Sequence, residues 1–200
     1  SSGNPALKKA ALAALANIGS PDSYDVLYKA AKSVNFTYEP TDAAEAFLNY
    51  TDRLGEENQT ELCKKACKII FKANQTDEKL HNYSKALAIY TKYFGSEALP
   101  LLLKAVNNSD KAFRYSALNL AEKMDDIATT RAWIEKAKSS ADVTKAEIID
   151  MLGRKGDLFA VNFITESLNS QSASVREESI KALVKLEDTK AISLIISYLA

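Results

Sequence analysis

The chain has 200 residues, of which 46% are hydrophobic, so it is long enough to bury a core as one domain or as one run of repeats. Lys and Arg total 26, as do Asp and Glu, and the resulting net charge of zero weakens any general case for binding nucleic acid or an acidic membrane. Six Gly and four Pro are few, which favours long helices joined by short connections.

Six segments repeat one pattern of apolar and small residues, at offsets 0, 4, 5, 7, 8 and 11 from a starting residue. Offsets 0, 4, 7 and 11 trace one face of a helix, and offsets 5 and 8 widen it. Each segment, called a template helix below, is therefore predicted to be covered by neighbours on more than one side. In chain order the template helices start at Leu7, Ala43, Asn82, Phe113, Thr144 and Val175.

The spacing of these segments and a second pattern between them define the repeat. The last four starts are 31 residues apart, and inserts such as residues 35–40 (NFTYEP) lengthen the first two intervals to 36 and 39 residues. Between template helices, the apolar set Leu99, Leu102, Leu103 and Val106 recurs at +31, +62 and +93, the last copy at residues 192–199. Each repeat is therefore predicted to be a helical hairpin. The whole is predicted to be all-α: an α-solenoid of stacked antiparallel hairpins, a right-handed superhelix of about eleven helices.

Helix-capping residues agree with these boundaries. Gly19, Gly55 and Gly95 are predicted to close three template helices, and Ser174 with Glu177 reads as a capping box at the start of the last one. Pro100 lies inside the second apolar pattern. If Ser96 caps that helix, Pro100 is its fourth residue and is expected to bend the helix rather than break it.

The segments EALPLLLKAVNNSDKAFRYSALNLAEKM and AVNFITESLNSQSASVREESIKALVKLED resemble HEAT repeats. The marks are the helical hairpin, Pro100 in a first helix, and Arg114 and Arg176 each following the apolar residue that opens a second helix. The turn aspartate that pairs with this arginine in the family is replaced here by Asn107, Asn108 and Ser170, so the chain departs from the family's regular Asp–Arg ladder at these turns. Tetratricopeptide repeats, the rival hairpin family, have a 34-residue spacing and a signature that this chain lacks.

The resemblance implies one HEAT-like repeat domain over residues 1–200 and a non-catalytic protein-interaction scaffold or binding module, which can be attached to an enzyme. The alternative is a nucleic-acid-binding protein, as among the HEAT-like alkylpurine DNA glycosylases. A third class, bilin lyase-like enzymes built on related repeats, has no specific support in the residues. A protein partner is therefore expected, and nucleic acid is not the preferred ligand.

Residues with catalytic or metal-binding chemistry are few. His81 is the sole histidine and lies near a helix start with no nucleophile motif beside it, so no active site and no cofactor are expected. Cys63 and Cys67 are spaced i, i+4 among apolar neighbours and are predicted to be reduced, buried and metal-free. The alternative is a zinc site made by both cysteines and His81. Trp133 falls on the second apolar pattern and is predicted to lie in the core.

One polar position of the template helices is basic in five consecutive repeats. Offset 10 holds Asn17 in the first template helix and then the set we call the basic column: Arg53, Lys92, Lys123, Arg154 and Lys185. These cations are predicted to line one exposed edge. Two interpretations are open: each cation interacts with the dipole at its own helix C-terminus, or the row guides an acidic partner onto the scaffold.

The compartment is left open by the sequence. The chain opens without a signal peptide, has no apolar run long enough to span a bilayer, and ends on an apolar helix, so we expect an excised segment of a longer protein. Six asparagines lie in N-x-S/T sequons, which is typical of helix caps or of a secreted glycoprotein. They are Asn35, Asn49, Asn58, Asn74, Asn82 and Asn107.

Overall fold

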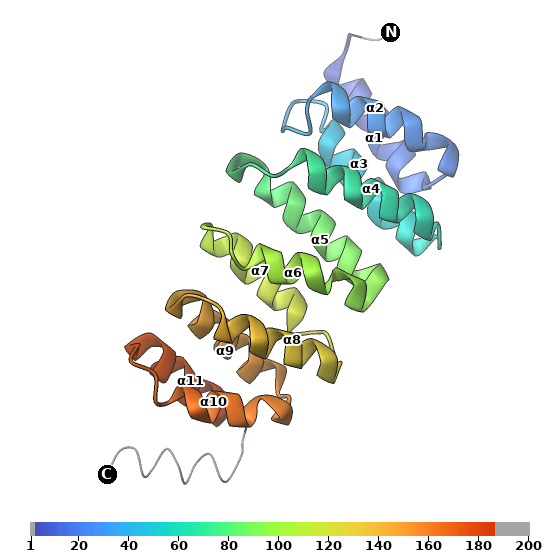
Figure 1. The fold of residues 1–200 in the computed structure, drawn as a ribbon. Helices are drawn as coiled ribbons and strands as arrows, with labels where there is room; N and C mark the ends of the chain where they lie inside the picture. The colour runs from blue at the N-terminus through green and yellow to red at the C-terminus, as the bar shows by residue number, and fades with distance from the viewer. Residues whose placement is uncertain (1–2, 187–200) are drawn as a thin grey trace. The chain divides into compact units, whose positions relative to one another are not determined.

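The computed structural model describes residues 3–186 and is all-α over that range, with no strand (Figure 1). Every predicted template start falls inside its own helix. These template helices are α1 (Pro5–Ile18), α3 (Ala43–Glu56), α5 (Leu80–Phe94), α7 (Lys111–Ala121), α9 (Asp142–Lys155) and α11 (Ala173–Lys185).

Within residues 3–186, a second helix follows each of the first five template helices. These second helices are α2 (Tyr24–Ser33), α4 (Thr60–Ala73), α6 (Leu99–Ala105), α8 (Ile127–Lys138) and α10 (Val161–Ser167). Short 3₁₀ turns precede four of the helices, at η1 (Pro21–Ser23), η2 (Asp77–Lys79), η3 (Gly95–Ala98) and η4 (Leu158–Ala160). The alternation confirms the predicted solenoid of helical hairpins. The last predicted helix, residues 192–199, lies outside the described residues.

The chain divides into two compact units, residues 1–98 and residues 99–200. In the first unit, the template helices α1 and α5 pack against α3, and α2 and α4 cover α3. In the second unit, α9 packs against both α7 and α11, α8 covers α9, and α10 covers α11. Whether the repeats form a right-handed superhelix and a single domain depends on how the two units are arranged, so both features stay predictions.

The core of the first unit centres on Phe47 of α3, which is fully buried. Tyr24 of α2 and Phe36 from the 35–40 insert approach its ring edge-on, with centroid distances of 5.9 and 6.2 Å. Tyr50, one turn further along α3, is also fully buried, and its hydroxyl donates a hydrogen bond of 2.9 Å to the Ser20 carbonyl. The insert therefore closes the side of a hairpin with an aromatic side chain.

The core of the second unit confirms two placements made from the sequence. Trp133 of α8 is fully buried beside the apolar face of α9, and Val175 of α11 is also fully buried. Two template helices of this unit, α9 and α11, approach closely because Gly153 of α9 has no side chain. A Cβ added at Gly153 would lie 2.6 Å from the Cα of Ala182 on α11. A larger residue at this glycine would therefore push the two helices apart.

Leu7 differs from the prediction, although it holds the same template offset as Val175 and Phe113. Its exposed fraction is 57%, whereas Val175 is fully buried and Phe113 is 6% exposed. The physical reason is that no described helix packs on this face of α1. The offset pattern marks the residues that the preceding repeat covers, and α1 has no preceding repeat among the described residues.

Several helix ends differ from the predicted caps. Gly19 and Gly95 end α1 and α5 with positive φ angles of 71° and 52°, as predicted. Gly55 instead lies inside α3, and the ring of Tyr93 occupies the space of its missing Cβ. The α-helix containing Pro100 begins at Leu99, so the proline lies in the first turn, where an N–H has no partner to lose.

The predicted capping box of Ser174 and Glu177 is wrong. Helix α11 begins at Ala173, with Ser172 at its N-cap position, so Ser174 already lies in the first turn. Glu177 instead forms an ion pair with Lys181 at 2.7 Å. One residue of difference in the helix start therefore removes the box.

Arg114 and Arg176, the arginines near the start of α7 and α11, form hydrogen bonds, but their partners are not a turn aspartate. Arg114 donates to both carboxylate oxygens of Glu147 on α9, at 2.7 Å each, and to the carbonyls of Asn108 and Ser109 in the preceding turn. Arg176 donates to the carbonyls of the 170–171 turn at 2.7 and 3.0 Å. In both repeats the guanidinium therefore holds the turn through backbone oxygens.

Candidate binding surfaces

The residues with catalytic or metal-binding chemistry are not brought together. His81 is exposed in the first turn of α5, beside a hollow of about 40 Å³ that Tyr38 and Glu45 also line. Cys63 and Cys67 are free thiols on α4, and both are fully buried, as predicted. Within residues 3–186 no cluster of three or more His, Cys, Asp or Glu side chains is placed to hold a metal ion. That the cysteines hold no metal stays a prediction.

The two cysteines interact with each other on α4. A hydrogen bond with Cys63, together with burial, raises the pKa of the Cys67 thiol far above its usual range, whereas the same bond lowers the pKa of Cys63. A thiol with a raised pKa is not a nucleophile near neutral pH. The geometry therefore gives Cys67 a packing role.

The basic column is largely engaged in ion pairs in the first unit. Arg53 binds Glu56 and Glu57 of its own helix end, at 3.0 and 2.6 Å. Lys92 of α5 reaches Asp52 of α3 at 2.9 Å. This second contact joins neighbouring template helices.

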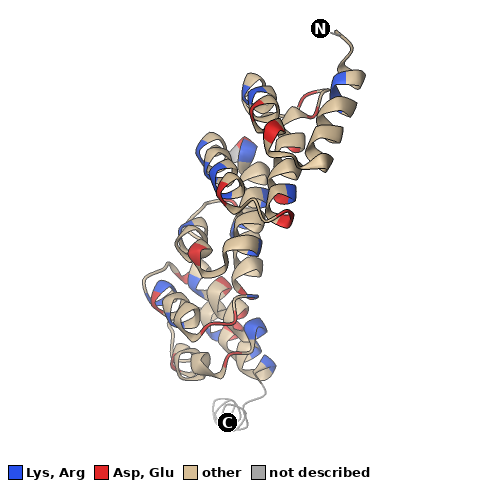
Figure 2. Ribbon diagram, turned by 90° about the vertical axis from the view of Figure 1, so that its right-hand side faces the viewer, with Lys and Arg blue, Asp and Glu red and all other residues tan. Residues whose placement is uncertain are grey.

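The second unit repeats this arrangement. Arg154 of α9 binds Asp150 at 3.1 Å and also contacts Glu122 at the end of α7, and Lys185 of α11 binds Asp150 at 2.8 Å. Burial raises the pKa of Asp150, but the contacts with Lys185 and Arg154 outweigh it, and the pKa of this carboxyl is lowered overall. Lys123 is exposed in the turn after α7 and forms no ion pair with any described residue. Figure 2 shows basic and acidic residues interspersed along the helices.

A different set of lysines lies along α4 and lines a groove of about 440 Å³. These residues recur at helical spacing and share one face of α4, and we call this surface the lysine groove. Lys64 forms an ion pair of 2.5 Å with Glu97, but Lys65, Lys68 and Lys72 form none with any described residue. The groove is lined by Glu61, Lys64, Lys65, Lys68, Ile69 and Lys72.

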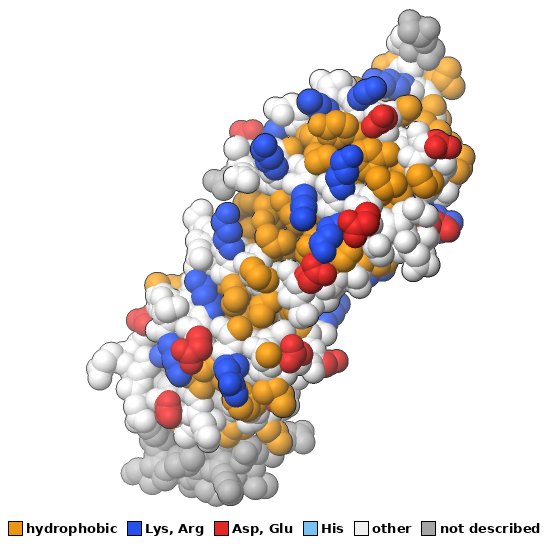
Figure 3. All heavy atoms as spheres, turned by 45° about the vertical axis from the view of Figure 1, so that its right-hand side comes forward, with side chains coloured by type: hydrophobic (Ala, Val, Ile, Leu, Met, Phe, Trp, Pro, Cys, Tyr) orange, Lys and Arg blue, Asp and Glu red, His pale blue; other side chains and the backbone are white. Residues whose placement is uncertain are grey.

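Aromatic rings underlie the cations of the lysine groove. The ammonium of Lys65 lies 4.9 Å from the ring centroid of Tyr24, and that of Lys64 lies 5.2 Å from the ring of Phe94. In the part of the molecule nearer the N terminus, Figure 3 shows Lys and Arg side chains set among hydrophobic side chains. This surface therefore presents positive charge and apolar area together.

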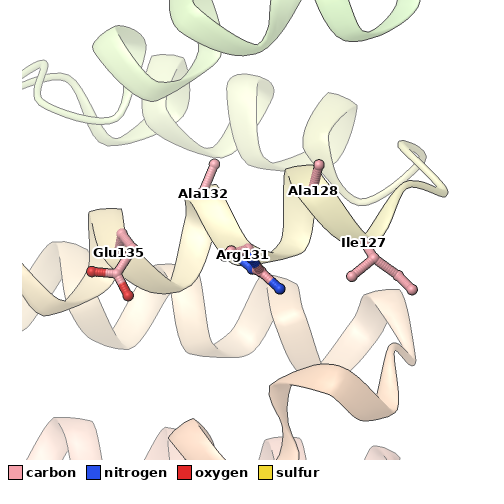
Figure 4. A pocket seen from close by; sticks show the side chains of 5 residues that line it. All are labelled: Ile127, Ala128, Arg131, Ala132 and Glu135. Carbon is pink, nitrogen blue, oxygen red and sulfur yellow. The ribbon is translucent and has the colours of Figure 1, made fainter.

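A groove of similar size lies at the equivalent place on α8. The hollow therefore recurs from repeat to repeat, whereas its charge depends on the residues that line it. The α8 groove measures about 480 Å³ and is lined by Ile127, Ala128, Arg131, Ala132 and Glu135 (Figure 4). When the buried residues of α8 and α4 are aligned, Arg131 corresponds to Lys64, Ala132 to Lys65 and Glu135 to Lys68. The lysine groove is strongly basic, whereas the α8 groove carries one cation and one carboxylate.

The lysine groove was missed in the sequence analysis, although its signal was visible. The segment TELCKKACKIIFKA holds Lys64, Lys65, Lys68 and Lys72 at helical spacing. The cysteines of this segment, Cys63 and Cys67, are typical metal ligands, whereas lysines on one face of a helix are usually only solvated surface residues. Which lysines have carboxylate partners depends on other helices and cannot be read from the segment alone.

The fold and these surfaces describe a helical-repeat scaffold, and comparison with known families defines its type. A family model for HEAT repeats matches residues 130–200, and a model of the PBS lyase HEAT-like repeat matches residues 7–33. These two matches support a HEAT-like repeat family for the chain, as the resemblance implied. No curated protein shows a significant match to it.

Two general statements follow from this assignment. HEAT repeats generally serve as protein-interaction scaffolds, and families built from them are typically non-catalytic.

Among the described residues, none of the helices is both long enough and apolar enough to cross a bilayer.

Proposed function

We propose that this HEAT-like repeat protein is a non-catalytic protein-binding module, and that its lysine groove accepts an acidic amphipathic segment of a partner protein. The observation that carries the proposal is that Lys65, Lys68 and Lys72 line one groove without a carboxylate partner among the described residues. Four of the five cations in the basic column already have such partners.

The composition of the groove supports a protein ligand over a nucleic acid. A phosphate backbone binds through its charges, and its affinity grows with the number of cations that contact it. The lysine groove instead combines cations with Ile69 and with the rings of Tyr24 and Phe94 beneath Lys65 and Lys64. A helix with acidic residues on one side and apolar residues beside them would use both features.

The basic column is a second candidate surface, but most of its cations already have carboxylate partners, unlike those of the lysine groove. An acidic partner would have to displace carboxylates that Arg53, Lys92, Arg154 and Lys185 already bind. We therefore infer that Lys92, Arg154 and Lys185 mainly join neighbouring template helices, whereas Arg53 binds carboxylates at the end of its own helix. Lys123 is the member that a partner can contact without breaking an ion pair.

The test compares two variants that lose the same charge. The first replaces Lys65, Lys68 and Lys72 with Gln, and the control replaces Lys8, Lys104 and Lys111 with Gln, all exposed and none in an ion pair among the described residues. The probes are a labelled helical peptide with Glu on one face and Leu beside it, and a DNA duplex, each titrated at low and high salt.

We expect the groove variant to bind the peptide about tenfold more weakly, which is about 1.4 kcal/mol, and the control to bind like the unmodified protein. Binding should weaken with salt because exposed charges are screened. Equal losses in both variants would show that only net charge matters and would reject the groove. Tighter, groove-dependent binding of the duplex would favour the nucleic-acid alternative.

A further inference from the structure

Helix α2 continues the pattern of cations over aromatic rings that the lysine groove begins. The ammonium of Lys65 on α4 lies 4.9 Å from the ring centroid of Tyr24 on α2. The ring of Tyr24 lies 6.3 Å from the ring of Tyr28, and the ammonium of Lys32 lies 5.6 Å from this second ring. Two neighbouring rings of α2 therefore carry one cation from α4 and one from α2 itself.

The lysines of α2 lack a carboxylate partner among the described residues. Lys29 and Lys32 are exposed, and neither forms an ion pair with any described residue. Asp25, in the first turn of the same helix, pairs with neither of them. Val26 is 52% exposed and Tyr28 is half-buried, so apolar area lies beside these cations. The surface called the α2 extension below consists of Val26, Tyr28, Lys29 and Lys32.

The repeat does not require a cation at this place on a second helix. When the buried residues of the second helices are aligned, Lys29 of α2 corresponds to Lys68 of α4. The equivalent residues of α8 and α10 are Glu135 and Glu166. The dipole at a helix C-terminus favours Lys32, which lies in the last turn of α2, but this effect fades beyond that turn. The fold accepts either sign of charge here, so folding alone does not explain why the first unit has lysines.

We propose that the acidic helix bound in the lysine groove also contacts the α2 extension, so that one partner segment spans α4 and α2. Neighbouring helices pack about 8–10 Å apart, and seven residues of a helix rise about 10.5 Å. The partner helix therefore carries two acidic clusters about seven residues apart. One cluster meets Lys65 and Lys68, and the other meets Lys29 and Lys32. This inference rests on the function proposed for the groove and adds the second cluster to it.

The apolar part of the α2 extension favours a protein helix over a nucleic acid, the competing occupant. Phosphates would contact the lysines, but a phosphate backbone gains little from an exposed Val26 or a half-buried Tyr28. An amphipathic helix places apolar side chains between its acidic clusters, where these two residues lie beside the cations.

The experiment uses two labelled peptides of equal length, both stapled so that they are equally helical. One peptide carries two Glu clusters one heptad apart with Leu beside them, and in the other Gln replaces the second cluster. Each is titrated at low and high salt against the unmodified chain, the groove variant described above, and an α2 variant with Lys29→Gln and Lys32→Gln. The control, Lys8→Gln with Lys111→Gln, loses the same charge at two exposed lysines that form no ion pair with any described residue.

We expect the two-cluster peptide to bind the unmodified chain about fivefold more tightly than the one-cluster peptide, because each exposed ion pair contributes modestly. The α2 variant should bind both peptides equally, whereas the control should keep the fivefold preference. High salt should remove the preference because it screens exposed charges. The groove variant should bind both peptides about tenfold more weakly.

The outcomes separate this inference from the function on which it rests. An α2 variant that keeps the fivefold preference, or a control that loses it equally, would overturn the inference while the groove variant still tests the groove. A groove variant that binds both peptides like the unmodified chain would reject the function proposed for the groove, and the inference with it. A DNA duplex that binds more tightly than the two-cluster peptide, and that only the α2 and groove variants weaken, would also overturn the inference, because the occupant would then be a nucleic acid.

Discussion

Removing Glu147 should destabilise the second unit more than any surface substitution. Arg114 and Glu147 form two hydrogen bonds of 2.7 Å between α7 and α9, and only 10% and 8% of their side-chain surfaces are exposed. At this burial, solvent screens the pair weakly. Glu147→Ala would leave the guanidinium buried without its counter-charge.

The magnitude follows from what the variant leaves behind. Removing one partner of a buried ion pair costs about 3–5 kcal/mol, because the remaining charge stays desolvated. Arg114 keeps the carbonyls of Asn108 and Ser109, at 3.0 and 2.9 Å, so we expect the lower part of that range, about 3 kcal/mol. For a protein of this size the melting temperature should fall by roughly 6–12 °C.

The assay is urea unfolding followed by circular dichroism, with hydrogen exchange to locate the loss in α7 and α9. The control is the double variant Arg114→Met, Glu147→Leu, which removes both charges and keeps apolar volume. It should be much closer to the unmodified protein than Glu147→Ala is. A Glu147→Ala protein within about 0.5 kcal/mol of the unmodified one, or a double variant as unstable as the single, would refute the reasoning.

Three further predictions concern single residues. Val175→Asp would place an unpaired carboxylate in a fully buried site and should cost several kcal/mol of unfolding free energy; an unchanged melting temperature would contradict this. Asp150 has a lowered pKa in the folded protein, so the stability that it contributes is present above its unfolded pKa of about 3.9 and is lost as the pH falls through the lower folded value. Asp150→Asn should therefore be less stable near neutral pH and lose less stability on acidification, as measured by urea unfolding across that range. The purified protein should contain no zinc by elemental analysis, whereas stoichiometric zinc that Cys63→Ser removes would show that the cysteines bind metal.

The apolar pattern of the sequence is sufficient to predict the helices and most of the core. Apolar residues recur with a period near 3.6, and the whole pattern repeats every 31 residues, so stacked helical hairpins are the arrangement that buries the apolar face of each helix. Trp133 and Val175 are buried, as this pattern predicts. Local periodicity is sufficient here because each repeat contacts mainly its neighbours in the chain. Helix ends were less well determined, as Gly55 and Ser174 show, since a shift of one residue changes the cap.

Which side chains contact each other depends on how the helices pack in three dimensions. Leu7 and Val175 hold the same template position, yet one is exposed and the other buried, because the difference lies in the neighbouring helix. The partner of Arg114 is a glutamate 33 residues away. Four of the five cations in the basic column have carboxylate partners, whereas Lys65, Lys68 and Lys72 of α4 have none among the described residues. Such contacts join side chains on different helices, and their distances are fixed by how the helices pack, which the periodicity of one segment does not encode.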